Sequence, residues 1–395
     1  MTDAPGIRLH RRMTARDTAE PHRVSSPLEL LFDLTFVVAV AQLVVQLAHG
    51  LERGHGADEI APFLMVFFAI WWAWMNFTWF ASAYDTDDVP YRLLTLVQMG
   101  GVLVLAAGVP AAFLDQDFRA ITVGYLIMRL GLVAQWLRAG AEHPDGRATA
   151  WRYAAGVSLV QLGWLARLAL PEELGLASFV VLVALELAVP PWAERSGSTF
   201  WHPHHISERY GLFTIILLGE GVLAAIYGVQ DALEARGFSG DLVLVSVASF
   251  VAVFALWWLY FLEPAGEGLS ANRGRSYLWG YGHYGVFVSL AALGAGLEVA
   301  VADAGHHVEA SATTLAFAVA LPVGFFLLLL WATHAVLDTR SQVRPAVILP
   351  AAAAVLLVPL LAGTVGVTVV VIVIAALCVL IVAFTVADQL RRARG

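Results

Sequence analysis

Residues 60–84 read IAPFLMVFFAIWWAWMNFTWFASAY, a run of apolar and aromatic residues without a single charged side chain. A helix needs about 20 mostly apolar residues to cross the hydrocarbon layer of a membrane, and this run is long enough. The stretches 242–262 and 345–387 are equally free of charge. Lipid admits only helices or closed barrels, and no stretch alternates as a barrel strand does. The sequence therefore predicts an all-α membrane protein.

The composition of the whole chain points to the same class. Of its 395 residues, 59% are hydrophobic and 14% are charged, whereas an ordinary globular chain has about 45–50% and about 25%. These fractions exclude a disordered chain, a soluble α/β enzyme and a nucleic-acid binder, and they make the lipid bilayer the expected partner. The single cysteine, Cys378, excludes an intramolecular disulfide and a cysteine metal cluster.

Windows of about 20 residues give twelve candidate membrane-spanning helices, so we expect a polytopic helix bundle. The stretch 345–387 is too long for one span, and we expect a tight turn at Ala362-Gly363-Thr364. The twelve windows are 28–48, 60–83, 92–112, 119–138, 151–169, 174–190, 207–228, 241–262, 276–300, 312–335, 345–362 and 364–387.

The two halves of the chain resemble each other. Trp71-Trp72 and Trp257-Trp258 each begin an aromatic stretch in corresponding spans, and similar sequences follow Gln98 and His283. Six spans in each half would give both halves the same orientation, which is a parallel repeat. We predict a tail at 1–27, a first six-helix repeat at 28–190, a linker at 191–206, a second six-helix repeat at 207–387 and a tail at 388–395.

The arginines predict the orientation in the membrane. Most of the 23 basic residues, all of them arginine, fall in the tails and in the connections on one side of the predicted spans. The positive-inside rule therefore places both termini in the cytoplasm, with an even number of spans. Residues 1–27 are polar and rich in arginine, so a cleavable signal peptide is not expected.

Ionisable side chains within spans are costly and usually face the protein interior, which makes them the first candidates for function. They are Glu29, Asp33, Arg129, Glu186, Glu208, Glu220, His283, Glu298 and His334.

Glu29 and Asp33 are four residues apart at the start of the first span, so they share one helix face. Two carboxylates there favour a cation or proton site near the cytoplasmic mouth. For Glu29 the alternative is a purely structural role as part of a capping box. Ser26 would be the N-cap, Pro27 the first helical residue and Glu29 the residue at N3.

Glu220 lies between Gly219 and Gly221, near the expected midplane of the seventh span. A carboxyl group at that depth must be protonated, paired or bound to a cation. The flanking glycines allow close helix approach or exposed backbone carbonyls. We expect Glu220 to bind substrate or an ion. The alternative is a protonated side chain that makes one interhelical hydrogen bond.

Arg129 is the one arginine near the centre of a span, and a guanidinium keeps its charge. We expect it to pair with Glu220 or Asp33, either as a structural lock or as a switch that substrate opens. His283, in the ninth span, joins the candidate binding residues on its position alone.

His205 and Glu208 have the spacing of three that helical metal sites use. Because Pro203 interrupts the helix before His202 and His204 could join them, we assign no metal and no cofactor and keep His205 and Glu208 only as candidate ligands.

Asp87, Asp88 and Arg92 lie in an acidic cytoplasmic connection, which we interpret as a hinge between the second and third spans. The acidic run resembles half of an EF-hand loop but lacks its glycine and its final glutamate, and a solvated loop is the alternative.

Three motifs resemble the bacterial low-temperature-requirement A (LtrA) family: SPLELLFDLTFV at 26–37, DTDDVPYR at 85–92 and ERYGLFTIILLGE at 208–220. The segment YGHY at 281–284 is a weaker fourth match. Gly221 departs from the family pattern, which usually has a serine there. The resemblance implies a bacterial multipass inner-membrane protein associated by name with growth in the cold, without a settled activity. It draws attention to Glu29, Asp33, Asp87, Asp88, Arg92, Glu208, Arg209 and Glu220.

These features favour a secondary transporter or an ion- or proton-coupled permeation protein for a small solute, proton or cation. Glu220 would be the coupling carboxylate, Arg129 its counter-charge, and Asp33 with Glu29 a second site. One alternative is an intramembrane enzyme acting on lipid or a lipid-linked substrate, although no Gly-x-Ser-x-Gly, His-Glu-x-x-His or phosphate-binding loop is found. Another is a sensor or scaffold whose inward polar groups are fully paired. A homo-oligomer is left open.

Overall fold

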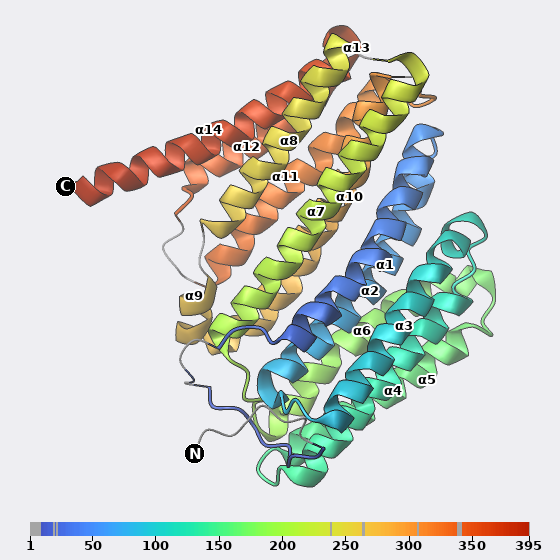
Figure 1. Cartoon of the computed structure of the whole chain (residues 1–395), viewed down its shortest axis with the longest axis vertical. Coiled ribbons are helices and arrows are strands. Elements are labelled where there is room, and N and C mark those ends of the chain that lie inside the picture. Colours follow the sequence, from blue (N-terminus) through green and yellow to red (C-terminus); the bar gives the residue numbers. More distant parts are fainter. Residues whose placement is uncertain are drawn as a thin grey trace. The chain divides into compact units, whose positions relative to one another are not determined.

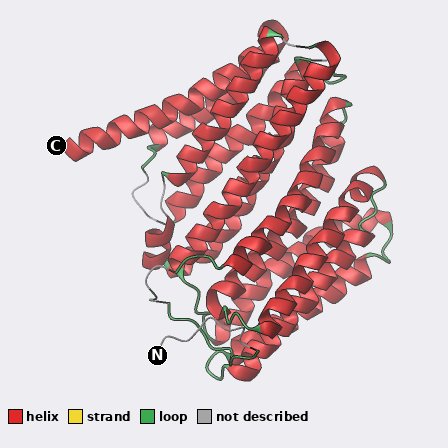
Figure 2. Ribbon diagram, viewed as in Figure 1, coloured by secondary structure: helices red, strands yellow, loops and turns green. Residues whose placement is uncertain are grey.

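The structure is a computed structural model that describes residues 9–18, 20, 23–237, 239–262, 265–305, 308–337 and 342–394. The described residues form helices and connecting loops (Figure 2). Residues 1–8, 19, 21 and 22 of the predicted N-terminal tail, and the final residue 395, lie outside this part.

Each of the twelve predicted windows falls on one of the longer helices in the described part (Figure 1). These are α1 (Pro27–Glu52), α2 (Gly56–Tyr84), α3 (Val89–Leu114), α4 (Arg119–Glu142), α5 (Arg147–Arg167), α6 (Gly175–Ala193), α7 (Pro203–Arg236), α8 (Gly240–Phe261), α10 (Ser276–Asp303), α11 (Ala312–Val336), α12 (Pro345–Leu357) and α14 (Val367–Arg394). Shorter elements are α9 (Ala265–Ala271), α13 (Ala362–Val365) and the 3₁₀ turns η1 (Glu172–Leu174), η2 (Glu194–Ser196), η3 (Arg273–Arg275) and η4 (Val358–Leu361).

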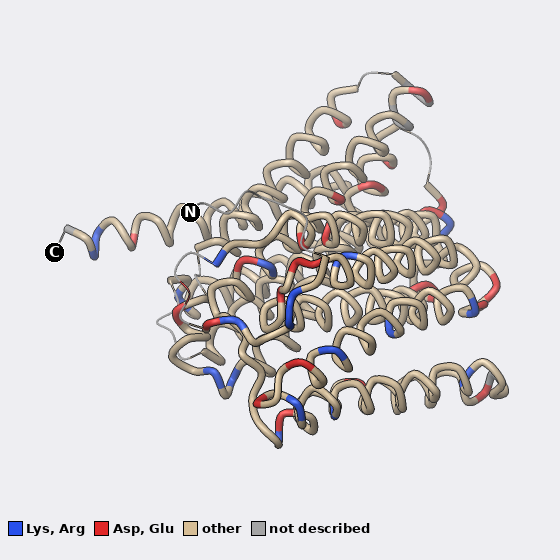
Figure 3. Tube along the Cα trace, turned by 60° about the horizontal axis from the view of Figure 1, so that its bottom comes forward, with Lys and Arg blue, Asp and Glu red and all other residues tan. Residues whose placement is uncertain are grey.

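Among the described residues, eleven helical segments are long and apolar enough to cross a membrane, one fewer than predicted. The difference is α5, where Arg147, Arg152, Gln161 and Arg167 lower the apolar character of the helix. Figure 3 shows acidic and basic residues gathered mainly at helix ends and in the loops, as expected for a multi-pass membrane protein.

The predicted break near residue 363 is real, but its position was wrong. Ala362-Gly363-Thr364 belongs to the short helix α13, and the chain departs from helical geometry at Gly366, which has a φ of 85°. Glycine adopts this left-handed conformation without the steric cost that a Cβ brings, which explains why the break falls there.

The chain divides into two compact units, each built from two stretches of sequence. Unit 1 comprises Met1–Ala39 with Met65–Arg209, and unit 2 comprises Val40–Leu64 with Tyr210–Gly395. The predicted parallel repeats at 28–190 and 207–387 are not confirmed by this division and stay a prediction. Helix α14 continues through residues 388–394 of the predicted C-terminal tail.

Small residues let the helices approach closely within each unit. In unit 1, a Cβ on Gly124 of α4 would overlap the Leu105 backbone of α3, and a Cβ on Gly108 would overlap Ala120. In unit 2, a Cβ on Gly296 of α10 would overlap the Ala318 carbonyl group of α11. Without a hydrophobic driving force between helices in lipid, this close packing is a main source of stability.

Candidate functional site

Glu29 and Asp33 of α1 share one buried arginine in unit 1. Arg209 of α7 places Nη1 3.0 Å from Oε1 of Glu29 and Nη2 2.5 Å from Oδ1 of Asp33. The exposed fraction is 0% for Glu29 and Arg209 and 2% for Asp33. The i, i+4 spacing therefore does place both carboxylates on one face, directed at the same cation.

The predicted capping box is confirmed at the start of α1. The Ser26 backbone N–H donates to Oε2 of Glu29 at 2.7 Å, and the Glu29 N–H donates to Oγ of Ser26 at 3.3 Å. The other oxygen, Oε1, lies 3.0 Å from Nε2 of His205 as well as beside Arg209. Glu29 thus caps the helix with Oε2, whereas its Oε1 lies beside Arg209 and His205.

The two carboxylate oxygens of Asp33 differ in their hydrogen bonding. Its Oδ1 accepts the Trp74 indole N–H at 2.7 Å in addition to the bond from Arg209, which also donates to Oγ1 of Thr78 at 3.3 Å. Within the described part of the chain, Oδ2 of Asp33 and Nε of Arg209 have no hydrogen-bond partner. A buried polar atom without a partner is costly, so Oδ2 of Asp33 can take up a proton or accept a hydrogen bond, and Nε of Arg209 can donate one to a water or a solute.

Arg23 extends this cluster toward the loop between α2 and α3. Its guanidinium lies 3.8 Å from Oε1 of Glu29 and 3.4 Å from Oδ2 of Asp85. Arg16 lies 3.3 Å from the same oxygen of Asp85. We refer to the six residues Asp85, Arg23, Glu29, His205, Arg209 and Asp33 as the ionisable chain.

Asp85 ends the ionisable chain at a polar cavity of about 250 Å³, which we call the vestibule. Three arginines and three acids are among its lining residues, namely Arg11, Arg12, Arg16, Asp17, Glu20 and Asp85. Burial, reinforced by the charge of Glu29, raises the pKa of the Asp85 carboxyl to about 6. Asp85 therefore changes its charge near neutral pH, next to the vestibule.

Titration of Asp85 gives a first prediction. Between its usual pKa of about 3.9 and about 6, the folded chain holds a proton that the unfolded chain has lost, so the contribution of Asp85 to folding stability falls as pH rises through this range. We expect a carboxyl infrared signal with a midpoint near pH 6 that Asp85→Asn removes. Asp87→Asn, two residues away but half exposed, is the control and should leave the signal intact. A signal that survives in Asp85→Asn would contradict the assignment.

The predicted partner of Arg129 was wrong. Arg129, for which Glu220 or Asp33 was expected, pairs with Glu186 of α6, whose Oε2 lies 3.3 Å from Nη2. Glu186 also accepts hydrogen bonds from Trp72 at 2.8 Å, Tyr125 at 3.0 Å and Trp164 at 3.1 Å. Arg129 donates to the Tyr125 hydroxyl as well. The carboxylate is fully satisfied by four donors from three other helices, an arrangement suited to holding α2, α4, α5 and α6 together.

Glu220 lies in unit 2 with an exposed fraction of 6%. The described residues provide neither an ion pair nor a hydrogen bond for its carboxyl group. Arg129, its expected partner, is paired with Glu186 instead, and binding of a proton, ion or substrate by Glu220 stays a prediction.

His283 lies in an aromatic environment in unit 2. Its Nδ1 is 2.8 Å from the Trp279 carbonyl oxygen, and its Nε2 is 3.3 Å from the Tyr260 hydroxyl. Tyr210 meets the imidazole edge-on with ring centroids 5.0 Å apart. Both nitrogens are engaged within the chain, and a binding role for His283 stays a prediction.

Asp87 and Asp88 of the acidic connection differ in exposure and in partners. Asp88 caps α3 through the Tyr91 N–H and binds Arg138 through both oxygens, at 2.8 and 2.6 Å. Although burial opposes its charge, these bonds lower the pKa of Asp88 to about 2. Asp87 pairs with Arg92 at 2.7 Å, and both are about half exposed. The hinge proposed for Asp87, Asp88 and Arg92 is not tested by these contacts.

The two candidate metal ligands face different partners. His205 contacts Glu29, whereas Oε1 of Glu208 accepts the Ser25 N–H at 3.3 Å. In the portion of the chain that is described, no three His, Cys, Asp or Glu side chains are grouped as metal ligands would be.

Several members of these clusters were not predicted from the residues alone. His205 and Arg209 are four apart on α7, so they share a face, and this spacing could have placed both beside the α1 carboxylates. Glu186 was visible as an acid in a span of the same predicted half as Arg129. Trp74 and Arg23 left no comparable signal, because their roles depend on tertiary contacts.

Comparison with known proteins is consistent with this architecture. The model of the family described as bacterial low temperature requirement A protein (LtrA) matches residues 24–383. An uncharacterized protein of Rhizobium meliloti (strain 1021), RA0937, is 27% identical over 292 residues, which cover 69% of this chain and 68% of the relative. The family match extends over both units and includes every residue of the ionisable chain except Arg23, which directly precedes it. The chain therefore belongs to the LtrA family of multi-pass helical membrane proteins.

Proposed function

We propose that this protein is a proton-coupled permeation protein or secondary transporter of the bacterial inner membrane, in which the ionisable chain carries the proton. The observation that supports this most directly is that the charged groups of the ionisable chain form an unbroken series of close contacts. Successive charged groups lie 2.5–3.8 Å apart from Asp85 to Asp33. A buried acid at one end lies beside the vestibule, and the acid at the other end has a free oxygen.

The arginines and the acids have different tasks in this proposal. Guanidinium groups keep their protons, so the proton is held by the carboxyl groups and His205, and Arg23 and Arg209 only keep these groups close together in one buried cluster. Arg23 and Arg209 hold the carboxylates ionised when no proton is present. A proton that reaches Asp33 neutralises it, weakens its pair with Arg209 and leaves Arg209 to Glu29 alone. Such a local change of charge can bias a conformational equilibrium, as transport requires.

Glu220 remains in the proposal as a second proton or cation site. A buried carboxyl group without a counter-charge is most stable when it is protonated or bound to a cation. Its role is separate from that of Glu186, whose four hydrogen-bond donors leave it no comparable freedom.

The proposed orientation keeps both termini in the cytoplasm, which requires α5 to cross the membrane as a twelfth helix. Its 21 residues span about 31 Å at 1.5 Å per residue, close to the thickness of the hydrocarbon layer, about 30 Å. Its arginines lie near its two ends, at Arg147, Arg152 and Arg167, and leave 153–166 without charge.

Proton flux into liposomes tests the proposal. The purified chain is reconstituted with an internal pH-sensitive dye, and a potassium diffusion potential drives protons inward. Liposomes with the wild-type protein should acidify faster than empty ones, and Asp33→Asn should reduce the rate to that of empty liposomes, because it removes the last titratable group of the ionisable chain.

Asp87→Asn is the matched control, since it removes an acid of the same type outside the ionisable chain. It should retain wild-type flux. Equal flux in wild-type and empty liposomes would contradict permeation. If Asp85 still titrated near pH 6 in that case, the sensor alternative would be favoured.

A further inference from the structure

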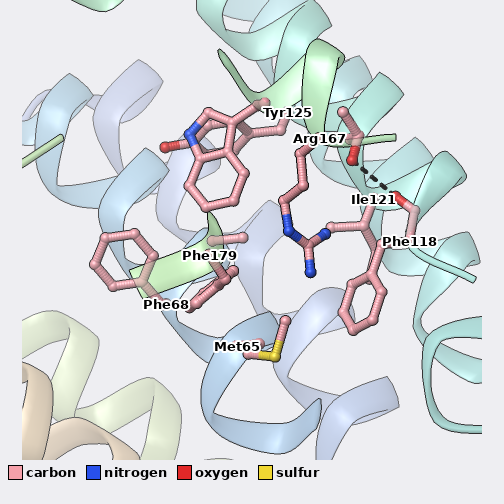
Figure 4. Close-up of a pocket in the computed structure, with 10 residues that line it drawn as sticks. Met65, Phe68, Phe118, Ile121, Tyr125, Arg167 and Phe179 are labelled. Atoms are coloured by element: carbon pink, nitrogen blue, oxygen red, sulfur yellow. Dashed lines mark hydrogen bonds between the residues drawn. The ribbon is translucent and has the colours of Figure 1, made fainter. Parts of the chain in front are cut away.

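We propose that a cavity between α2, α4, α5 and α6 binds the carboxylate of an apolar acid, such as a fatty acid. This site lies within unit 1, is separate from the ionisable chain, and does not depend on proton permeation. Figure 4 shows its aromatic side chains arranged around the guanidinium of Arg167.

Arg167 supplies a positive charge that no carboxylate among the described residues neutralises. Its Nε and Nη2 both donate to the Gly175 carbonyl oxygen, at 3.2 and 3.0 Å, which fixes the guanidinium at the end of α5. The guanidinium carbon lies 5.4 Å from the centroid of the Phe118 ring and 5.8 Å from that of Phe179. Within the described residues, no carboxylate pairs with Arg167 and its Nη1 makes no hydrogen bond, so this nitrogen can donate to a bound anion.

Hydrogen bonds and ring contacts outside the cavity fix the side chains that line it. Tyr125 and Trp164, which line it, each donate a hydrogen bond to Glu186, at 3.0 and 3.1 Å. Phe179 packs edge-on against Trp164 with ring centroids 5.3 Å apart. Rings that are fixed before binding lose little entropy when a ligand arrives. The buried Arg129–Glu186 cluster thereby orients two walls of this cavity.

Size and charge together select the ligand. The cavity volume is about 30 Å³, which admits a group of about the size of one or two water molecules. A carboxylate is a small anionic group of this order, whereas a phosphodiester is larger and a cation would be repelled by Arg167. The remaining lining side chains, among them Met65, Phe68 and Phe179, are mostly apolar, so they can contact the first carbons of the ligand's hydrocarbon chain.

A fluorescent fatty acid, 11-(dansylamino)undecanoic acid, provides the test. It is titrated into the purified full-length protein in a neutral detergent, and Kd is read from its fluorescence. Arg167→Gln should weaken binding at least about tenfold, as expected for losing a charge-assisted hydrogen bond in an apolar site. Arg119→Gln is the matched control: Arg119 begins the adjacent helix, its side chain is 82% exposed, and its loss should leave Kd within about twofold.

Two further measurements distinguish binding of the probe at this site from its nonspecific partitioning onto apolar surfaces of the protein or into the micelle. The methyl ester of the probe, which has no charge, should bind wild-type and Arg167→Gln protein equally weakly. Ala69→Leu, which fills the cavity while keeping Arg167, should also weaken binding of the acid. An unchanged Kd in Arg167→Gln would overturn the proposal, as would displacement of the probe by inorganic phosphate but not by oleate. Size-exclusion chromatography and melting curves confirm that each variant is folded.

Discussion

Replacing Arg209 with glutamine is expected to lower the free energy of unfolding by about 3–5 kcal/mol, because it leaves two buried carboxylates without their common cation. Glu29 and Asp33 both contact Arg209, and all three are almost fully removed from solvent. Glutamine can replace some of the hydrogen bonds but not the charge. Unfolding in a detergent micelle, followed by tryptophan fluorescence, measures the loss.

A double variant identifies the cause of this loss. Arg209→Gln combined with Asp33→Asn removes the cation together with one of its two anions, so it should be more stable than Arg209→Gln alone. If the double variant is less stable by the sum of the two single effects, the residues do not interact energetically. A cost below about 1 kcal/mol for Arg209→Gln would show that water or a rearranged side chain compensates for the lost cation.

Replacing Glu186 with leucine is expected to have a similar effect, about 3–5 kcal/mol, because Arg129 then remains buried without its anion. Trp72, Tyr125 and Trp164 also lose their common acceptor. Thermal unfolding of the purified protein gives the size of the change. A fully stable Glu186→Leu variant would contradict the structural role assigned to this cluster.

The double variant Arg129→Met with Glu186→Leu tests whether the loss of stability comes from the unpaired Arg129. Well-packed apolar side chains often replace a buried ion pair at little or no cost, so this variant should recover most of the lost stability. It should also retain proton flux, because the Arg129–Glu186 cluster lies outside the ionisable chain. In Asp33→Asn, by contrast, flux should be lost even where stability is largely kept. These two results would distinguish a structural cluster from a functional one.

The helices were predictable because the charge-free stretches are long and because lipid excludes other backbone structures. The capping box at Ser26 and Glu29 was also predictable, since it depends on residues three apart in sequence. For the same reason Glu29 and Asp33 were correctly placed on one face. At 362–366 the local signal was ambiguous, and only the φ of Gly366 shows where the helix ends.

Pairing between helices was less predictable. Arg129 required an anion, but hydropathy does not say which helices are neighbours, so Glu220 or Asp33 was predicted and Glu186 was missed. Arg209 was highlighted only by the family resemblance, although its spacing from His205 on α7 already placed the two on one face. The spacing of His205 and Glu208 pointed to a common ligand, yet in the structure they contact Glu29 and Ser25 respectively.

The most direct test of proton movement along the ionisable chain is the flux of reconstituted protein measured as a function of pH. Wild-type flux should change with a midpoint near pH 6, where Asp85 gains its proton. Asp85→Asn should abolish this midpoint, and Asp33→Asn should abolish the flux itself, while Asp87→Asn preserves both. Wild-type liposomes that acidify no faster than empty ones at any pH would contradict the account.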